Sequence, residues 1–167
     1  MDASHQPRKA IRLKGFDYSS AGAYFITVCI KDRRPILWKN VGAAISRPDQ
    51  VPLSAIGQIV DTAIAQIPDH YSNIRLDKYC IMPDHIHLIL FIDADENGQQ
   101  IAAPTISNVI GQMKRWASKQ AGYSIWQKSF IDRVIRNEQG YLAVWEYIDN
   151  NPIKMDTAND FPDFSFV

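Results

Sequence analysis

The spacing of apolar positions changes from one segment of the chain to the next, and it predicts strands and helices in alternation. The β-branched and aromatic run 23–30 predicts a strand that ends in the charged turn 31–35. From 55 to 67 apolar residues recur every three or four positions, which predicts a helix with Ser54 as its N-cap and Pro68 at its end. The first part of the chain therefore predicts a strand followed by a helix.

The rest of the chain continues this alternation. An apolar run interrupted by a turn at Pro83 and Asp84 predicts a hairpin, and its second strand contains His85 and His87. An amphipathic helix and a last strand follow a polar loop, and a further helix ends the pattern. The predicted elements are strands 73–81, 85–91 and 124–135, the polar loop 93–104, helix 105–121 closed by Gly122, and helix 139–150 ending at Asn151-Pro152.

The order β-α-β-β-α-β followed by a terminal helix is typical of the ferredoxin-like split βαβ fold, an α+β architecture with one antiparallel sheet. In this fold the histidine-containing strand lies in the middle of the sheet, and only the terminal helix is left to cover its histidine face. A chain of 167 residues, 46% of them hydrophobic, has material for one core. We therefore expect a single domain over 1–167, with a basic N-terminal arm (1–15) and an acidic C-terminal tail (153–167).

Two of the four histidines lie on one face of an otherwise aliphatic strand. Side chains alternate along a strand, so His85 and His87 point the same way while Ile86 points into the core on the other side. Two neighbouring imidazoles form half of a metal site. The alternative is a strand with two solvated or hydrogen-bonded histidines, and the spacing alone leaves both interpretations open.

The terminal helix supplies two further polar groups. Tyr147 and Asn151 are four residues apart and therefore share a face of this helix. With the helix over the sheet, a phenol, an amide and two imidazoles would converge. Tyr141 lies six residues before Tyr147 and so faces another way, and Tyr123 follows Gly122 in a turn. The alternatives are a packing role for Tyr147 and a helix C-cap role for Asn151.

The cysteines and the hydropathy exclude several classes of protein. Cys29 and Cys80 both lie in apolar, strand-like runs, so we expect buried, reduced thiols and no disulfide framework. No second Cys or His completes a tetrahedral set with Cys80 and His85, which argues against a zinc site. No run approaches the roughly 18–20 apolar residues of a membrane span, and the start of the chain has no apolar signal core. These features predict a cytoplasmic protein with no membrane association.

The net charge is zero, but charge is segregated along the chain. Residues 1–40 and 101–140 carry net charges of +5 and +4, whereas 41–100 and 141–167 carry −5 and −4. If the two basic segments share a face, they form a groove for a phosphate backbone. The alternative is a solvated helix surface and a basic tail. The cations of the expected groove are Arg8, Lys9, Arg12, Lys14, Lys114, Arg115, Lys119, Arg133 and Arg136.

Several short motifs occur together in one order and spacing. They are Ile11-Arg12-Leu13-Lys14-Gly15-Phe16-Asp17-Tyr18, Gly22-Ala23-Tyr24-Phe25-Ile26-Thr27, Met82-Pro83-Asp84-His85-Ile86-His87, Trp126-Gln127-Lys128-Ser129-Phe130 and Tyr147-Ile148-Asp149-Asn150-Asn151-Pro152. Over this span the chain resembles the REP-associated tyrosine transposases, a branch of the single-tyrosine HUH transposases. It departs from them at Phe130-Ile131-Asp132-Arg133, where relatives often have an aromatic-His-Asp-His sequence.

The resemblance implies both the reaction and the site. It implies that His85, His87 and Asn151 bind Mg²⁺ or Mn²⁺ and that Tyr147 is the nucleophile. The implied reaction is the nicking and rejoining of single-stranded hairpin or palindromic repeat DNA through a 5′-phosphotyrosine intermediate, as in DNA transposition. The residue types suit this chemistry, because a phosphotyrosyl ester keeps the bond energy for rejoining and neutral ligands leave the charge of the cation to the phosphate.

Two other functions stay open. One is a catalytically inactive or domesticated relative that only binds hairpin or single-stranded DNA. The other is a ferredoxin-like RNA-binding module, whose sheet would carry exposed aromatic residues, a pattern that 79–91 lacks. Trp116 and Trp126 are candidates for stacking on unpaired bases or for the core. Monomer and homodimer are both compatible with the sequence.

Overall fold

A computed structural model describes residues 21–39, 51–94 and 105–154 of the chain. Four strands form one sheet, and their order in it is β2-β3-β1-β4. The strands are β1 (Gly22–Cys29), β2 (Ile74–Ile81), β3 (His85–Ile92) and β4 (Ile131–Ile135). The helices are α1 (Ala55–Ala65), α2 (Ile67–His70), α3 (Ile106–Ala121) and α4 (Glu138–Lys154), and a short 3₁₀ turn, η1 (Lys31–Arg33), follows β1.

All three strand pairings are antiparallel, and β1 and β3 are the two central strands. This order confirms the predicted ferredoxin-like topology, with the histidine-containing strand in the middle of the sheet. In the register of β1 with β3, Thr27 lies opposite His87 and Cys29 lies opposite His85. Because partners in an antiparallel ladder point to the same face, these four side chains share one face of the sheet.

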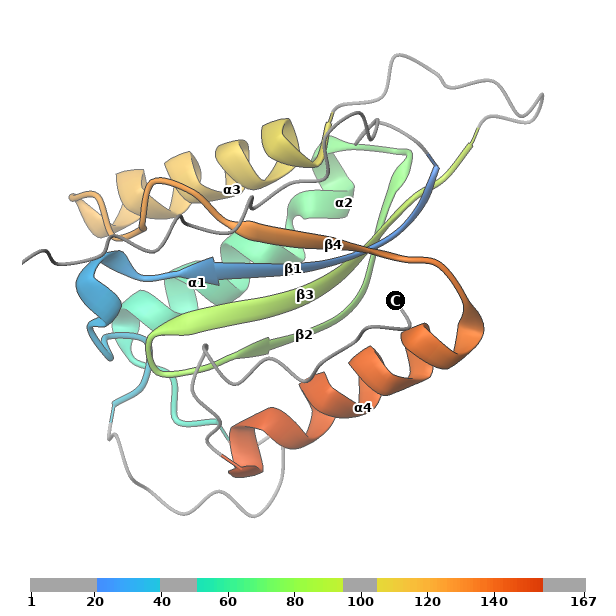
Figure 1. Ribbon diagram of the computed structural model, residues 1–167. Helices are drawn as coiled ribbons and strands as arrows, with labels where there is room; N and C mark the ends of the chain where they lie inside the picture. Colours follow the sequence, from blue (N-terminus) through green and yellow to red (C-terminus); the bar gives the residue numbers. More distant parts are fainter. Residues whose placement is uncertain (1–20, 40–50, 95–104, 155–167) are drawn as a thin grey trace, which may run out of the picture.

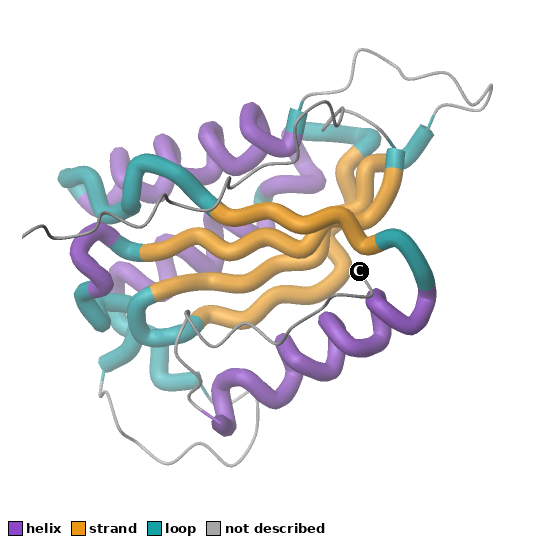
Figure 2. The backbone as a smooth tube through the Cα atoms, viewed as in Figure 1, coloured by secondary structure: helices purple, strands orange, loops and turns teal. Residues whose placement is uncertain are grey.

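The helices cover both faces of the sheet, as Figures 1 and 2 show, with α1, α2 and α3 on one face and α4 on the other. The face under α1 and α3 is the apolar core, where Tyr24, Ile26, Leu88 and Leu90 are completely buried. The histidine face lies under α4, as the sequence predicted. Among the described residues the sheet therefore offers no open platform of the kind that RNA-binding sheets use.

The predicted caps at Ser54 and Gly122 are present, and Thr105 is an additional cap. The hydroxyl of Ser54 accepts a hydrogen bond from Gly57 N at 3.0 Å, and Thr105 caps α3 in the same way through Asn108 N at 3.3 Å. Gly122 closes α3 with a φ of 82°, a left-handed conformation that glycine adopts without a steric penalty. These caps explain why α1 and α3 begin where the sequence predicts.

Two predicted boundaries are wrong at proline residues. Pro68 does not end the helical run but lies in the first turn of α2, where its missing N–H has no helical partner to lose. Pro152 does not end the terminal helix, because α4 continues to Lys154. Pro152 is buried beside Ile148, so packing of this turn offsets the helix bond that proline removes.

The predicted last strand is also too long, because only Ile131–Ile135 pairs with β1. The preceding segment makes a single bridge between Trp126 and Ile30 and otherwise runs as a loop. The arm 1–15, most of the loop 93–104 and the tail beyond 154 lie outside the described residues. Within the described part, no helix has both the length and the apolar character that crossing a membrane requires.

Candidate active site

Strand β3 places two imidazoles side by side beneath α4. His85 and His87 are 1% and 0% exposed, and their Nε2 atoms lie 3.1 Å apart. Their ring centroids are 4.7 Å apart with an interplanar angle of 75°, so the rings are not stacked but meet edge to face. The strand alternation that the sequence predicted thus brings two ring nitrogens to one point.

The other ring nitrogen of each histidine is held by a neighbouring side chain. Nδ1 of His85 lies 2.6 Å from Oδ1 of Asp84, and Nδ1 of His87 lies 2.7 Å from the hydroxyl of Thr27. A carboxylate only accepts hydrogen bonds, so Nδ1 of His85 carries the proton and Nε2 presents a lone pair. Such partners on the far nitrogen orient a metal-binding imidazole. Asp84 in turn accepts a hydrogen bond from Nε of Arg33 at 2.8 Å.

The surroundings of the pair favour a neutral His87 and an ionised Asp84. Burial, with His85 and Arg33 as neighbours, lowers the pKa of His87 well below its usual value of 6.5. Burial raises the pKa of Asp84, but its hydrogen bonds from His85 and Arg33 outweigh this effect, so the net change in pKa is downward. A neutral imidazole is the form that binds metal ions.

Helix α4 brings Tyr147 against His87. The centroid of its ring lies 5.3 Å from that of His87 and 6.1 Å from that of Phe25, both in edge-to-face geometry. One turn later on the helix, Asn151 is 1% exposed, and neither Oδ1 nor Nδ2 of its amide has a hydrogen-bond partner among the described residues. A buried amide without partners is costly, so this position calls for a ligand.

These residues fit a divalent cation. Two ligands at right angles around a cation, with bonds of about 2.1 Å, lie about 3.0 Å apart, close to the observed separation of the two Nε2 atoms. The described residues contain no group of three or more His, Cys, Asp and Glu side chains that could hold a metal. The buried amide of Asn151 offers an oxygen of the type that Mg²⁺ and Mn²⁺ accept as a ligand.

The structure separates Tyr147 from the two other C-terminal tyrosines. The hydroxyl of Tyr141 donates a hydrogen bond to Oδ2 of Asp77 at 2.8 Å, and its ring packs on Phe91 with a centroid distance of 5.9 Å. Tyr123 is 46% exposed just after the glycine that ends α3. Of the three tyrosines, only Tyr147 has a ring contact with a histidine of β3.

The described cations of the expected groove do not share one face. Lys114, Arg115 and Lys119 belong to α3, on the face of the sheet opposite to α4 (Figure 1). Arg133 lies opposite Phe25 in the β1–β4 register, which puts it on the histidine face, and Arg136 follows β4. The cations of α3 and Arg133 therefore do not line a single groove, because α3 packs on the face of the sheet opposite to the one that Arg133 shares with the histidines. Arg8, Lys9, Arg12 and Lys14 lie outside the described residues.

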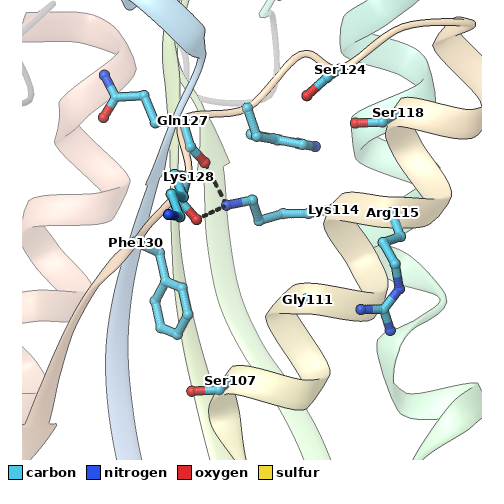
Figure 3. A pocket seen from close by; sticks show the side chains of 10 residues that line it. Ser107, Gly111, Lys114, Arg115, Ser118, Ser124, Gln127, Lys128 and Phe130 are labelled. Atoms are coloured by element: carbon cyan, nitrogen blue, oxygen red, sulfur yellow. Dashed lines mark hydrogen bonds between the residues drawn. The ribbon is translucent and has the colours of Figure 1, made fainter.

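A separate groove of about 480 Å³ lies between α3 and the segment before β4. In Figure 3, the amino group of Lys114 reaches across it and donates hydrogen bonds to the carbonyl oxygens of Gln127 and Lys128, at 2.6 and 3.2 Å. Phe130 and Trp126 also line this groove, but Trp126 is 5% exposed and belongs to the core. Lys114 therefore has a structural role in joining α3 to this segment.

Sequence analysis missed two contributors to the site. Thr27 contacts His87 only because of the register between β1 and β3, which the sequence does not specify. Arg33 contacts Asp84 from a turn that is distant in sequence. The position of Asp84 directly before His85 is the one local signal for its contact with the imidazole.

Comparisons with known proteins add the following. No family model matches the chain. It is 32% identical over 165 residues to an uncharacterized protein of Haemophilus influenzae, with 87% of this chain and 88% of that protein aligned. It is 24% identical over 162 residues to a protein of the same organism named "Putative REP-associated tyrosine transposase", covering 90% and 82% of the two chains. The solved structure of a REP-associated tyrosine transposase bound to a REP hairpin has the same fold, with a TM-score of 0.64, 22% identity, and coverage of 90% of this chain and 80% of that one.

Proposed function

The chain belongs to the REP-associated tyrosine transposases, and on this basis we propose that it nicks and rejoins single-stranded DNA through a covalent bond to Tyr147. The proposed substrate is hairpin or palindromic repeat DNA, and the proposed cofactor is Mg²⁺ or Mn²⁺. The observation that carries the proposal is the ring contact between Tyr147 and His87 under α4. This contact supports a role for the phenol of Tyr147 next to His87, whose Nε2 lies 3.1 Å from that of His85.

In this proposal His85, His87 and the amide of Asn151 hold the cation. The two imidazoles are neutral and the amide is uncharged, so the protein ligands do not neutralise the positive charge of the ion. A bound Mg²⁺ or Mn²⁺ supplies charge that stabilises the phosphate oxygens as the bond to phosphorus is exchanged. Asp84 and Thr27 fix the orientations of the imidazoles through their Nδ1 atoms.

Tyr147 performs the covalent step of the proposed reaction. Its phenolic oxygen attacks the phosphorus, a tyrosine–phosphate bond forms, and the bond from phosphorus to the 3′-oxygen breaks. The phenol loses one proton and the departing oxygen gains one, so the exchange is balanced. Attack by a DNA 3′-hydroxyl on the phosphotyrosine reverses the chemistry and needs no ATP. Phe25 and His87 pack against the ring of Tyr147 and limit its movement.

Two observations support hairpin DNA as the partner. The related transposase of known structure is bound to a REP hairpin. In this chain Arg133 lies on the same face as the histidines, so its guanidinium comes from the sheet edge next to the site. A flexible single strand can bring its phosphate under α4, whereas an intact duplex is stiff and wide. We expect binding to weaken as salt rises, because the contacts are with phosphates.

A trapping experiment tests the proposal. The protein is incubated with a labelled hairpin that has a single-stranded flank and with Mn²⁺, and covalent complexes are separated on a denaturing gel. We expect a complex with the native protein and the Tyr141→Phe control, and none with Tyr147→Phe. Hairpin binding without any complex or cleavage would favour the alternative, a DNA-binding relative that no longer cuts.

A further inference from the structure

We propose that Arg33 is a positioning residue, which orients His85 for metal binding through the carboxylate of Asp84. This inference rests on the metal site proposed above. It adds to that site a residue whose side chain contacts Asp84 and Cys29 and not the proposed metal ligands.

The geometry assigns one oxygen of the carboxylate to each partner. Nε of Arg33 donates to Oδ2 of Asp84 at 2.8 Å, and Oδ1 of the same carboxylate lies 2.6 Å from Nδ1 of His85. With a bond on each side, the carboxylate cannot rotate without losing one of them. Arg33 therefore fixes the plane of the carboxylate, and the carboxylate fixes the proton and the ring orientation of His85.

Arg33 is itself held in place from β1. Its Nη1 donates to the sulfur of Cys29 at 3.3 Å, and Cys29 lies opposite His85 in the sheet register. The backbone N–H of Ile30 donates to the carbonyl oxygen of Asp84 at 2.9 Å, which ties the turn after β1 to the turn before β3. The side chain of Arg33 thus spans two segments that are 51 residues apart in sequence.

The backbone at Arg33 lies in a conformation that non-glycine residues rarely adopt. Asp32 and Arg33 have φ values of 57° and 54°, and two consecutive non-glycine residues in the left-handed region are unfavourable. Such strain persists where surrounding contacts hold it, and it is typical of functional positions. Arg34, the next residue, has an ordinary φ of −69° and is exposed. The chain therefore provides a matched control beside Arg33.

Mn²⁺ titration followed by electron paramagnetic resonance tests the inference without any DNA or turnover. We expect Arg33→Ala to weaken Mn²⁺ binding by about 10- to 100-fold, the usual effect of losing a group that orients a ligand. Asp84→Asn should weaken it by a similar factor, and Arg34→Ala should leave it within about twofold. Thermal melting of the metal-free proteins identifies any variant that does not fold, and Asp84→Asn then replaces Arg33→Ala as the deciding variant.

A second readout concerns the imidazole itself. In the metal-free native protein the ¹⁵N spectrum should show the proton of His85 on Nδ1, and Arg33→Ala should shift part of the population to Nε2. Native Mn²⁺ affinity in folded Arg33→Ala, with an unchanged ¹⁵N spectrum, would overturn the positioning role and leave the proposed function standing. Failure of the native protein to bind Mn²⁺ at all would overturn both.

Discussion

Replacement of Thr27 by valine tests whether the site is pre-oriented by the sheet register. Thr27 is 1% exposed, and its hydroxyl lies 2.7 Å from Nδ1 of His87. Valine has nearly the same shape and suits a strand, so the change removes one hydrogen bond and little packing. A buried polar group left without its partner costs about 1–3 kcal/mol. We expect the free energy of unfolding to fall by about this amount and Mn²⁺ affinity to fall by about 10- to 100-fold.

The assay combines urea denaturation of the metal-free protein with Mn²⁺ titration of the folded protein. Thr62→Val is the matched control, because the hydroxyl of Thr62 donates to the Gln58 carbonyl on the exposed side of α1, far from the site. Its effect on stability should stay within about 0.5 kcal/mol, with native Mn²⁺ affinity. If Thr27→Val loses stability but keeps native affinity, the hydroxyl contributes only to the stability of the fold and does not orient His87 for metal binding.

Three further predictions concern the fold, its pH dependence and the metal ligands. Gly57→Ala should destabilise the protein by about 1–3 kcal/mol in urea denaturation, because a Cβ would overlap the carbonyl oxygen of Leu37. Gly111→Ala should be neutral or stabilising, and equal effects of the two changes would contradict this packing. Burial and the hydrogen bond to an aspartate raise the pKa of Tyr79 from 10.0 to about 12, so between these pH values the unfolded chain releases a proton that the folded chain keeps, and stability falls as pH rises. Tyr79→Phe should flatten this alkaline decline in a pH series of thermal melts, and an unchanged slope would refute the assignment. His87→Ala should abolish cleavage in a nicking assay while hairpin binding in a gel-shift assay persists, and cleavage at the native rate would exclude the histidine as a ligand.

The sequence was sufficient for the parts of the fold that depend on local pattern. Strand alternation predicted that His85 and His87 share a face, and helical spacing predicted that Tyr147 and Asn151 do. The caps at Ser54 and Gly122 were predicted because their hydrogen bonds span only three residues. At these positions the local sequence alone determines the local structure.

The sequence was insufficient where contacts between residues distant along the chain determine the structure. The register that sets Thr27 against His87 depends on how two whole strands pair. The contact from Arg33 depends on two consecutive residues with positive φ, which their residue types do not predict. Pro152 stays helical because its surroundings bury it, which local propensity alone cannot show. The cations of α3 lie on the face of the sheet opposite to Arg133 because of where α3 packs, which is a property of the tertiary fold.

Mapping of the covalent linkage tests the central claim most directly. The native protein is trapped on a hairpin substrate with Mn²⁺, digested with a protease and a nuclease, and the modified peptide is sequenced by mass spectrometry. We predict a nucleotide attached to Tyr147, in the α4 peptide that also contains Asn151. A nucleotide on Tyr141 or Tyr123, or DNA cleavage with no attached nucleotide, would contradict the assignment of α4 and its tyrosine to the active site.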